Sequence, residues 1–417
     1  MLDIKLIREK TKEVKKALLK RMEKKDLDLK GVIALDDKRR ELIQKADELK
    51  AERNKFSKTK PSPEIIAKMK KIGEEIKKTD EELKTVEEKL QEKMASLPNL
   101  PADDVVAGGK ENNKVVKTFG KKPKFNFTPK DHVELATSLD IIDYKRAVKM
   151  SGTGFWAYKG AGALLEWALL NYFIDFHTKN GYIFLIPPFL LTEQSAYTSG
   201  HLPKFRDDLF WTQDKLCLNA TSEMMLGNYH RDEILEADDL PLKYFAYSAC
   251  FRREAGTYRK EERGMVRGHQ FNKIEMFHFT KPGDSWKSFA ELVKNAESLV
   301  EGLGLHYQSS QLAAGDASAA MSKTIDVEIW IPSMGIYKEV SSISNALDYQ
   351  ARRGNIRFKN YATGKNEYVH TLNASGLATS RLLPAILENY QQADGSVIIP
   401  KVLHKYLPGG LKVIKKK

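Results

Sequence analysis

Cysteine is scarce in this sequence of 417 residues. Cys217 and Cys250 are the only two, so neither a disulfide framework nor a zinc site built from four cysteines can form. Also missing are an apolar run of about 20 residues, which a membrane-spanning helix needs, and the apolar core and cleavage site of a secretory signal. We therefore expect free thiols in a reducing compartment and a cytoplasmic protein.

Two common nucleotide-binding signatures are absent as well. No Gly-x-x-x-x-Gly-Lys-Ser/Thr occurs, and no Gly-x-Gly-x-x-Gly opens a helix after a strand, which argues against P-loop and dinucleotide-binding folds. What the chain does have is an excess of basic residues, 69 Lys+Arg against 56 Asp+Glu, with a formal charge of +13. This charge favours a polyanionic partner without identifying one.

The N-terminal part of the chain carries two heptad repeats. Apolar residues recur seven apart at Leu35, Leu42, Leu49 and Phe56, and again at Met69, Ile76, Leu83, Leu90 and Leu97. A Pro-Ser-Pro breaker at 61–63 separates the two series. Since heptad spacing is typical of coiled coils, the sequence predicts an antiparallel α-helical coiled-coil hairpin with a short proline-containing turn. Each arm would extend roughly 45 Å at ~1.5 Å per residue, too long and thin for the core of a compact domain.

A polar, lysine-rich linker follows, and beyond residue 124 the pattern changes. Strand-like runs occur at 183–187, 209–218, 244–251, 274–280 and 325–332, and helix-like runs at 163–177, 286–302 and 377–391. Because several strands follow one another without a helix between them, we expect an α+β fold with a mainly antiparallel β-sheet flanked by helices. The predicted domains are residues 1–110 for the hairpin and 111–417 for the sheet.

One charged segment indicates an anion-binding cleft. Residues 251–257 read Phe-Arg-Arg-Glu-Ala-Gly-Thr, and 267–275 include Arg-Gly-His-Gln-Phe and Lys-Ile-Glu. Two strands joined by a polar loop would place Arg252 and Arg267 in one cleft, where guanidinium groups bind phosphate bidentately and Phe271 offers a ring for base stacking. Taken alone, an exposed hairpin with solvated arginines explains this segment equally well.

The segment also resembles motif 2 of the class II aminoacyl-tRNA synthetases, in the form found in seryl enzymes of the bacterial and eukaryotic type. Residues 373–391 resemble motif 3, and Gly181-Tyr182 with Ile-Pro-Pro at 186–188 resembles motif 1, which forms the dimer interface in that family. Residues 337–345 and 350–353 are similar to further signatures of the seryl enzymes. The resemblance covers essentially the whole chain, hairpin included.

This resemblance implies the activity of a serine–tRNA ligase. L-serine would be activated with ATP and Mg²⁺ to seryl-adenylate and transferred to tRNA(Ser), with tRNA(Sec) as a further candidate acceptor, by a homodimer. Neither step requires a protein nucleophile, so a site made of arginines, carboxylates and Mg²⁺ suffices. The dimer would form around residues 163–188, whose apolar residues are expected to be exposed on one chain, among them Leu164, Trp167, Ala168 and Phe173.

Site residues follow from the same resemblance, position by position. Arg252 would contact the α-phosphate and the serine carboxylate, Arg381 the γ-phosphate, and Phe271 the adenine. The implied catalytic residues are Arg252, Glu254 and Arg381. The implied serine-binding residues are Thr221, Ser222, Glu223, Arg252, Glu275 and Ser375. The implied ATP-binding residues are Arg252, Arg253, Glu254, Gly268, His269, Gln270, Phe271, Glu339, Val340, Ser341, Ser342 and Arg381.

Glu339 and Ser342 would hold Mg²⁺ through hard oxygen atoms. In the serine pocket, Glu275 and Ser375 would face the hydroxyl group, and Thr221 and Glu223 the ammonium group. The implied tRNA-binding residues lie in the hairpin and are Arg39, Arg40, Arg53 and Lys55.

The sequence departs from the family pattern at three positions, and it leaves other assignments open. Lys338 stands where arginine is common, Ser222 where alanine is common, and Pro384 falls within the expected motif 3 helix. A related synthetase for threonine, proline or glycine is one alternative, although such enzymes usually end in an anticodon-binding domain. A synthetase-derived paralogue that does not charge tRNA is the other, and the N-terminal hairpin argues against it.

Overall fold

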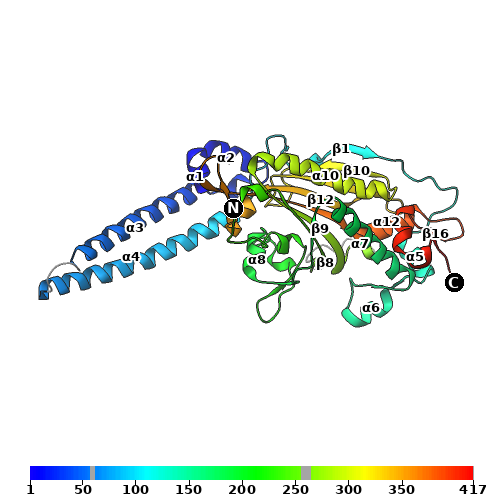
Figure 1. Cartoon of the computed structure of the whole chain (residues 1–417), viewed down its shortest axis with the longest axis horizontal. Helices are drawn as coiled ribbons and strands as arrows, with labels where there is room; N and C mark the ends of the chain where they lie inside the picture. The colour runs from blue at the N-terminus through cyan, green and yellow to red at the C-terminus, as the bar shows by residue number, and fades with distance from the viewer. Residues whose placement is uncertain (57–61, 255–263, 417) are drawn as a thin grey trace. The chain divides into compact units, whose positions relative to one another are not determined.

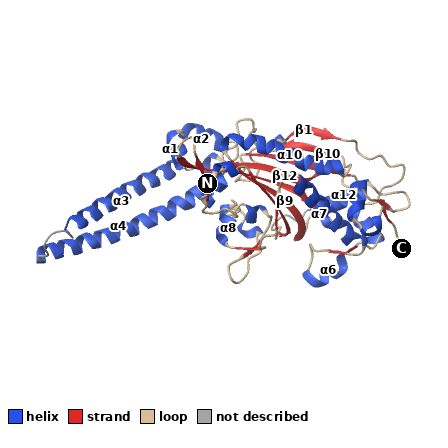
Figure 2. Ribbon diagram, viewed as in Figure 1, coloured by secondary structure: helices blue, strands red, loops and turns tan. Residues whose placement is uncertain are grey.

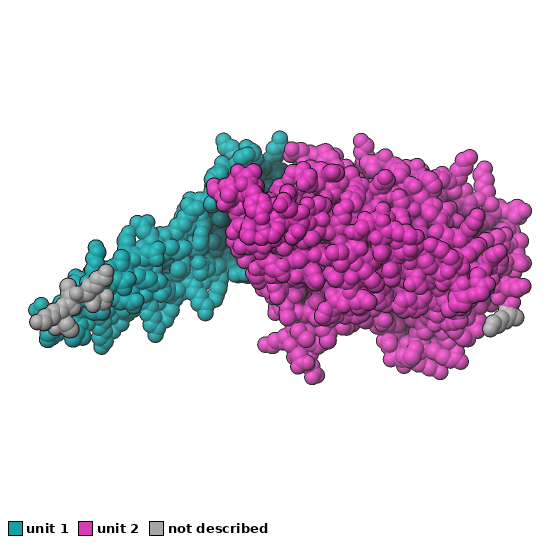
Figure 3. All heavy atoms as spheres, viewed as in Figure 1, with its two compact units in different colours: residues 1–100 teal, residues 101–417 magenta. Residues whose placement is uncertain are grey.

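The computed structural model describes residues 1–56, 62–254 and 264–416. Contacts within the chain divide it into two compact units, Met1–Leu100 and Pro101–Lys417, which Figure 3 shows in teal and magenta. Within the described residues the first unit is helical, and the second is built on a large β-sheet (Figure 2).

The first unit is dominated by a helical hairpin, in agreement with the heptad repeats. Its helices are α1 (Ile4–Glu9), α2 (Thr11–Leu18), α3 (Leu29–Phe56) and α4 (Pro63–Ser96). Two ion pairs join α3 to α4, Lys38–Glu82 (3.6 Å) and Glu52–Lys68 (3.3 Å), and the residue number falls along α4 as it rises along α3. The hairpin is therefore antiparallel (Figure 1). The expected turn lies largely in residues 57–61, outside the described residues.

The seam between the two long helices is apolar along most of its length. The residues buried in it are Val32, Leu42 and Ala46 of α3, and Ile72, Ile76, Val86, Leu90 and Met94 of α4. The start of α4 is capped by Ser62, whose hydroxyl accepts from the Ile65 N–H, and Pro63 occupies the first turn, where its missing N–H is harmless. Leu35 and Leu49 are only half-buried, so the repeat marks the face correctly but not the depth of each side chain.

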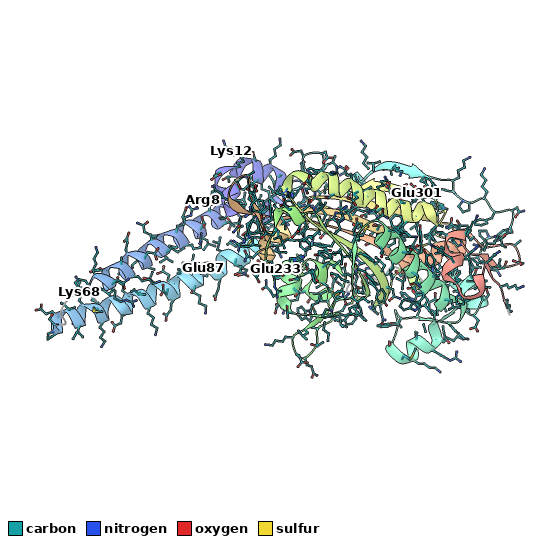
Figure 4. The ribbon with its side chains drawn as sticks, viewed as in Figure 1. Arg8, Lys12, Lys68, Glu87, Glu233 and Glu301 are labelled. Carbon is teal, nitrogen blue, oxygen red and sulfur yellow. The ribbon has the colours of Figure 1, made fainter. Side chains whose placement is uncertain are left out.

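A fully buried carboxylate interrupts the apolar surface of α3. Asp36 pairs with three guanidinium groups at 3.0 Å each, those of Arg8 on α1 and of Arg39 and Arg40 on α3 (Figure 4 labels Arg8). A buried charge is tolerated when such partners surround it. Asp36 therefore ties α1 to the hairpin, and it engages two of the arginines that were predicted to bind tRNA.

Removing the charge of Asp36 should loosen the helical unit. Asp36→Asn removes the charge that holds three arginines, whose side chains are 25%, 30% and 51% exposed and so remain solvated; we expect a loss of about 2 kcal/mol in unfolding free energy. The neighbouring Asp37→Asn is the matched control, because Asp37 pairs with the same Arg8 (2.6 Å) but is 57% exposed; it should lose under about 1 kcal/mol. Urea unfolding of the full chain, followed by circular dichroism at a helix band, measures both. Equal losses would contradict the assignment.

The second unit contains an eight-stranded sheet in the order β1-β10-β11-β12-β15-β9-β8-β4. Its strands are β1 (Lys114–Phe119), β10 (Tyr307–Gln311), β11 (Lys323–Ile331), β12 (Ile336–Leu347), β15 (His370–Ala378), β9 (Gln270–Thr280), β8 (Leu242–Phe251) and β4 (Ile183–Leu185). All neighbours pair antiparallel except β4 and β8. The predicted mainly antiparallel sheet is confirmed.

Three long helices pack on this sheet. They are α7 (Ala161–Lys179), α10 (Ser285–Gly302) and α12 (Thr379–Asn389). Phe173, Leu292 and Leu383, one from each helix, share a single apolar core with sheet residues such as Phe245 and Ile329. The helices thus cover the sheet with an apolar core and hold it in place.

Shorter elements complete the second unit. Its small helices are α5 (His132–Ser138), α6 (Tyr144–Ser151), α8 (Glu193–Thr198), α9 (Glu223–Leu226) and α11 (Tyr349–Gly354). Two-stranded sheets form between β2 (Ile142–Asp143) and β3 (Ala157–Tyr158), between β5 (Leu190–Leu191) and β6 (Cys217–Leu218), and between β16 (Val397–Ile398) and β17 (Val413–Ile414). A three-stranded sheet contains β14 (Lys365–Tyr368), β13 (Arg357–Asn360) and β7 (Ile234–Leu235). Across the residues described here, no helix has both the length and the apolar content needed to cross a membrane.

The helices and strands of the structure differ from those predicted from the sequence in two places. Residues 209–218 form a strand only at Cys217–Leu218, because a turn closed by Lys215 N–H to Thr212 O (3.1 Å) breaks the run. The expected helix at 377–391 begins at Thr379, since Leu377 still belongs to β15. Pro384 does lie inside α12, where its ring removes one backbone hydrogen bond.

Candidate active site

A cavity of about 510 Å³ in the second unit gathers residues that are far apart in the sequence. It brings together eight of the predicted site residues, namely Thr221, Glu223, Arg252, Glu254, Glu275, Glu339, Ser342 and Ser375. Arg267, the second arginine of the charged segment, lines it too. The two arginines therefore do share one cleft, as the pattern of two strands and a polar loop predicted.

The arginine side of the cavity is built where β8 ends. Arg252 follows the last residue of β8, its Nε donates to the carbonyl of Ala220 at 3.2 Å, and its guanidinium group lies 5.2 Å from the centre of the Phe271 ring. Glu254, in the left-handed region at φ 49°, forms an ion pair with Arg267. The polar loop that follows, residues 255–263, lies outside the described residues.

The remaining predicted residues of the charged segment do not line the cavity. His269 Nδ1 lies 2.9 Å from the Arg252 carbonyl oxygen, and Gln270 and Phe271 begin β9. Gly268 passes so close to Trp156 that a Cβ atom would lie 2.2 Å from the ring, so glycine is required there. Arg253 is held by its backbone N–H, which donates to the Asp208 carbonyl at 3.0 Å.

The opposite side of the cavity holds a buried ion pair that the residue patterns did not single out. Lys273 and Glu275 lie two apart on β9 and pair at 2.5 Å, with 5% and 1% of their surfaces exposed. The Lys273 ammonium also donates to Thr221 Oγ1 at 2.6 Å. Asn373 on β15 donates from Nδ2 to Glu275 Oε1 at 3.1 Å. Since side chains two apart on a strand share a face, Lys273 could have been assigned to the site together with Glu275.

Glu223 lies at the start of the short helix α9, and its carboxyl group is buried. Gln350, another residue that was not predicted to be in the site, donates from Nε2 to Glu223 Oε1 at 2.7 Å. Burial raises the pKa of Glu223 to about 7, and the charge of Glu275 acts in the same direction. Ser222 is fully buried, with its hydroxyl 2.7 Å from that of Ser248, so it does not line the cavity.

A second cavity of about 820 Å³ shares Glu339 and Ser342 with the first and adds Arg381 and Lys338. Arg381 Nη1 donates to the Glu339 carbonyl at 2.7 Å and lies 3.4 Å from its carboxylate. Glu339 and Ser342, which carry hard oxygen atoms, line both cavities. Val340 is buried in the core, and Ser341 donates to the carbonyl of Ser375 at 2.6 Å, so their side chains hold strands together.

Behind the cavities, a buried carboxylate connects three elements. Glu166 of α7 accepts from Asn272 Nδ2 of β9 at 2.8 Å and from Thr379 Oγ1 of α12 at 2.5 Å. Thr379 is the first residue of the helix that carries Arg381. The position of that arginine relative to β9 is therefore set from behind by Glu166.

The predicted interface and tRNA-binding residues lie outside these cavities. On α7, Leu164 and Trp167 are exposed, but Ala168 and Phe173 are fully buried in the core, so the expectation that these two would be exposed was wrong. The error has a simple cause, since α7 packs on the sheet through the face that carries them. In the other unit, Arg53 and Lys55 lie in the last turn of α3, whereas Arg39 and Arg40 contact Asp36.

Comparisons with known proteins agree across the chain. Residues 205–390 match the family model for the tRNA synthetase class II core domain (G, H, P, S and T), and residues 1–101 match the seryl-tRNA synthetase N-terminal domain. The chain is 53% identical to serine–tRNA ligase 2 of Clostridium acetobutylicum, over 98% of this chain and 99% of that protein. It is 46% identical to serine–tRNA ligase of Bacillus subtilis over 100% of both.

Solved structures give the same result. Seryl-tRNA synthetase from Pyrococcus horikoshii, complexed with ATP, aligns with a TM-score of 0.93 at 35% identity over 100% of both chains. Cytoplasmic serine-tRNA ligase from Naegleria fowleri, in complex with AMP, aligns with a TM-score of 0.86 at 31% identity, over 100% of this chain and 99% of that one.

The raised pKa of Glu223 should make the free protein less stable as the pH rises. Its folded pKa of about 7 lies above the ordinary 4.5, so its contribution to stability is full at pH 4.5 and is lost as the pH rises through 7. Glu223→Gln removes this loss, so between pH 5 and pH 8 the variant should retain about 2 kcal/mol that the wild type loses. Urea unfolding at both pH values measures the difference. Parallel pH profiles would count against a raised pKa for the buried Glu223.

Proposed function

Since the chain belongs to the seryl-tRNA synthetase family and joins serine to tRNA with ATP, we propose that serine is activated in the cavity between Arg252 and Glu275. The observation that carries this proposal is the convergence of motif 2, motif 3 and the residues Thr221 and Glu223 on one space of about 510 Å³. The family assignment decides against a threonyl, prolyl or glycyl enzyme. It also decides against a paralogue that does not charge tRNA.

The chemistry we propose uses positioning and charge. The serine carboxylate attacks the α-phosphorus of ATP and expels pyrophosphate. A tRNA ribose hydroxyl then attacks the adenylate carbonyl, which breaks the acyl–phosphate bond and releases AMP. Arg252, Glu254 and Arg381 are the catalytic residues. The planar guanidinium group of Arg252 binds the α-phosphate and the serine carboxylate, and Arg381 takes the γ-phosphate. Phe271, which already lies against Arg252, stacks on adenine.

Serine itself is proposed to lie across the far side of the cavity. Glu275 and Ser375, opposite each other on β9 and β15, face its hydroxyl group. Glu223 takes the ammonium group, with Thr221 beside it. A substrate cation stabilises the ionised form of a carboxyl whose pKa is about 7, so binding of serine and ionisation of Glu223 should favour each other.

Mg²⁺ is proposed to bind at Glu339 and Ser342. Mg²⁺ is commonly held by one or two protein oxygens together with substrate phosphates, and these two side chains border both cavities on β12. When bound, the ion supplies charge neutralisation between phosphate oxygens. Arg381, only 3.4 Å from the Glu339 carboxylate, lies where it can orient the same phosphates.

The hairpin is proposed to bind tRNA(Ser) through Arg39, Arg40, Arg53 and Lys55. Its apolar seam is filled by its own two helices, which leaves charged outer faces. Such faces contact phosphate and shape rather than bases, because the major groove of A-form RNA hides the bases from side chains. Whether tRNA(Sec) is accepted as well rests on the same contacts. We place this reaction in the cytoplasm, where tRNA is charged.

A homodimer is proposed on the basis of an exposed apolar patch. Trp167 of α7 is 54% exposed, and Ile183 and Ile186, in and just after the edge strand β4, are 53% and 71% exposed. Clustered apolar exposure of this kind marks an interaction surface. All three residues lie within 163–188, the part of the chain that includes the stretch resembling motif 1.

Serine activation tests the proposed site directly. Glu275→Ala removes the acceptor for the serine hydroxyl, so serine-dependent ATP–pyrophosphate exchange should fall at least ~10³-fold in kcat/KM while the KM for ATP changes less than about threefold. Wild-type exchange should respond to serine and to no other common amino acid. Full serine-dependent exchange by the variant would refute the pocket assignment.

Charging the apolar patch should separate the subunits. Ile186→Glu places a carboxylate in the proposed interface and should convert a dimer of twice 47.4 kDa to a monomer with little exchange activity. Ile398→Glu is the control, since Ile398 on β16 is also exposed (42%) but lies outside the patch. Multi-angle light scattering measures the molar mass of each variant in solution. A wild-type chain that is active as a monomer would rule out the dimer.

Deleting the hairpin should separate the two half-reactions. Replacing residues 35–94 by a short glycine linker should leave serine-dependent exchange within about threefold of wild type and abolish tRNA charging. Wild-type tRNA affinity should fall steeply with salt, whereas exchange should not, because phosphate contacts release counterions. Undiminished charging by the truncated protein would show that the hairpin is not the RNA-binding element.

A further inference from the structure

Lys273 is a buried cation in the middle of the proposed serine pocket. Burying an ammonium group is costly unless a partner of opposite charge accompanies it, and here Glu275 does so at 2.5 Å. The second contact, to Thr221 Oγ1 at 2.6 Å, joins β9 to the segment that leads into α9. The lysine thus links two residues to which serine contacts have been assigned.

Two carboxylates share this cavity, and Lys273 lies where it acts on both. Glu275 raises the pKa of Glu223, after the larger effect of burial, and Lys273 opposes that rise. Without the lysine, Glu275 would be a buried carboxylate with one amide donor, that of Asn373. Uncompensated burial favours the neutral form of a carboxyl, which is a hydrogen-bond donor as well as an acceptor.

The hydrogen bonds around the ion pair decide what the pocket can accept. Thr221 Oγ1 already accepts from Lys273 (2.6 Å) and from the Glu223 N–H (3.2 Å). On Glu275, Oε1 accepts from Asn373 Nδ2 at 3.1 Å and Oε2 pairs with Lys273 at 2.5 Å. Each carboxylate oxygen has a second lone pair, so Glu275 can accept one more hydrogen bond, and a ligand side chain that donates can supply it.

We propose that Lys273 is a specificity-determining residue of the serine pocket. It fixes the position of the Glu275 carboxylate, so the pocket prefers an amino acid whose side chain donates a hydrogen bond to that carboxylate and discriminates against alanine. This inference rests on the proposed function of the cavity. Serine supplies the donor through its hydroxyl. Alanine leaves buried acceptors unpaired, and sites of this kind reject such analogues by ~10⁴–10⁵.

The test compares serine with alanine in ATP–pyrophosphate exchange. Lys273→Met keeps the length of the side chain and removes the charge, so the ratio of kcat/KM for serine to that for alanine should fall at least ~100-fold, with the KM for ATP within about threefold of wild type. Lys243→Met is the matched control: Lys243 on β8 pairs with Glu291 at 2.7 Å outside the cavity. Its serine-to-alanine ratio should not change.

If Lys273→Met does not fold, Lys273→Gln is the second variant: it leaves Glu275 in place and keeps a neutral hydrogen-bond donor beside it, and its serine-to-alanine ratio should fall in the same way. A fall of less than about tenfold in the ratio, in whichever variant folds, would overturn the inference, and so would equal losses for serine, alanine and ATP. Absence of serine-dependent exchange in the wild type would instead refute the proposed function. The two failures are therefore distinguishable.

Discussion

The pairing of β9 with β15 is the constraint on which the cavity depends. Backbone hydrogen bonds place Ser375 opposite Glu275, and the alternation of side chains along β9 turns Lys273 and Glu275 to the cavity while Ile274 and Met276 enter the core. A slip of one residue would exchange the two sets. Ser341 on β12 adds a further restraint through its bond to the Ser375 carbonyl at 2.6 Å. The side chains proposed to select serine are therefore positioned by the sheet and not by a loop.

Both units bury charge, and they stabilise it in different ways. Asp36 is surrounded by three guanidinium groups, so its unit gains a cross-link between α1 and α3. In the cavity the compensation is incomplete, because Lys273 serves Glu275 while Glu223 is left with an amide partner and a pKa of about 7. A buried group with incomplete compensation destabilises the free protein, and a cationic ligand relieves it. A buried charge whose partners are complete, such as Asp36, is typical of a structural role, whereas a buried group with incomplete partners, such as Glu223, is typical of a binding site.

The sequence was informative where a period or a long motif carried the signal. Heptads predicted the hairpin, and the motifs predicted the residues that meet in the cavity. It was uninformative where the outcome depends on the tertiary partner of one side chain. No pattern marks Asp36 as buried, since its neighbours at 37–40 are all charged. Ala168 and Phe173 looked like interface residues until the sheet was found to cover them. Lys273 could have been predicted to line the cavity, because it lies two residues before Glu275 on the same strand and side chains two apart on a strand share a face.

Arg381 is held by two backbone carbonyl oxygens from different parts of the chain. Its Nη1 donates to the Glu339 carbonyl at 2.7 Å, and its Nε donates to the Val266 carbonyl at 3.4 Å. A guanidinium group carries five N–H donors in a rigid fork, so these two contacts fix its plane and do not use up its donors. For the proposed contact with a phosphate, a side chain that is already oriented loses little conformational entropy on binding. The two carbonyl oxygens thus pre-organise the arginine.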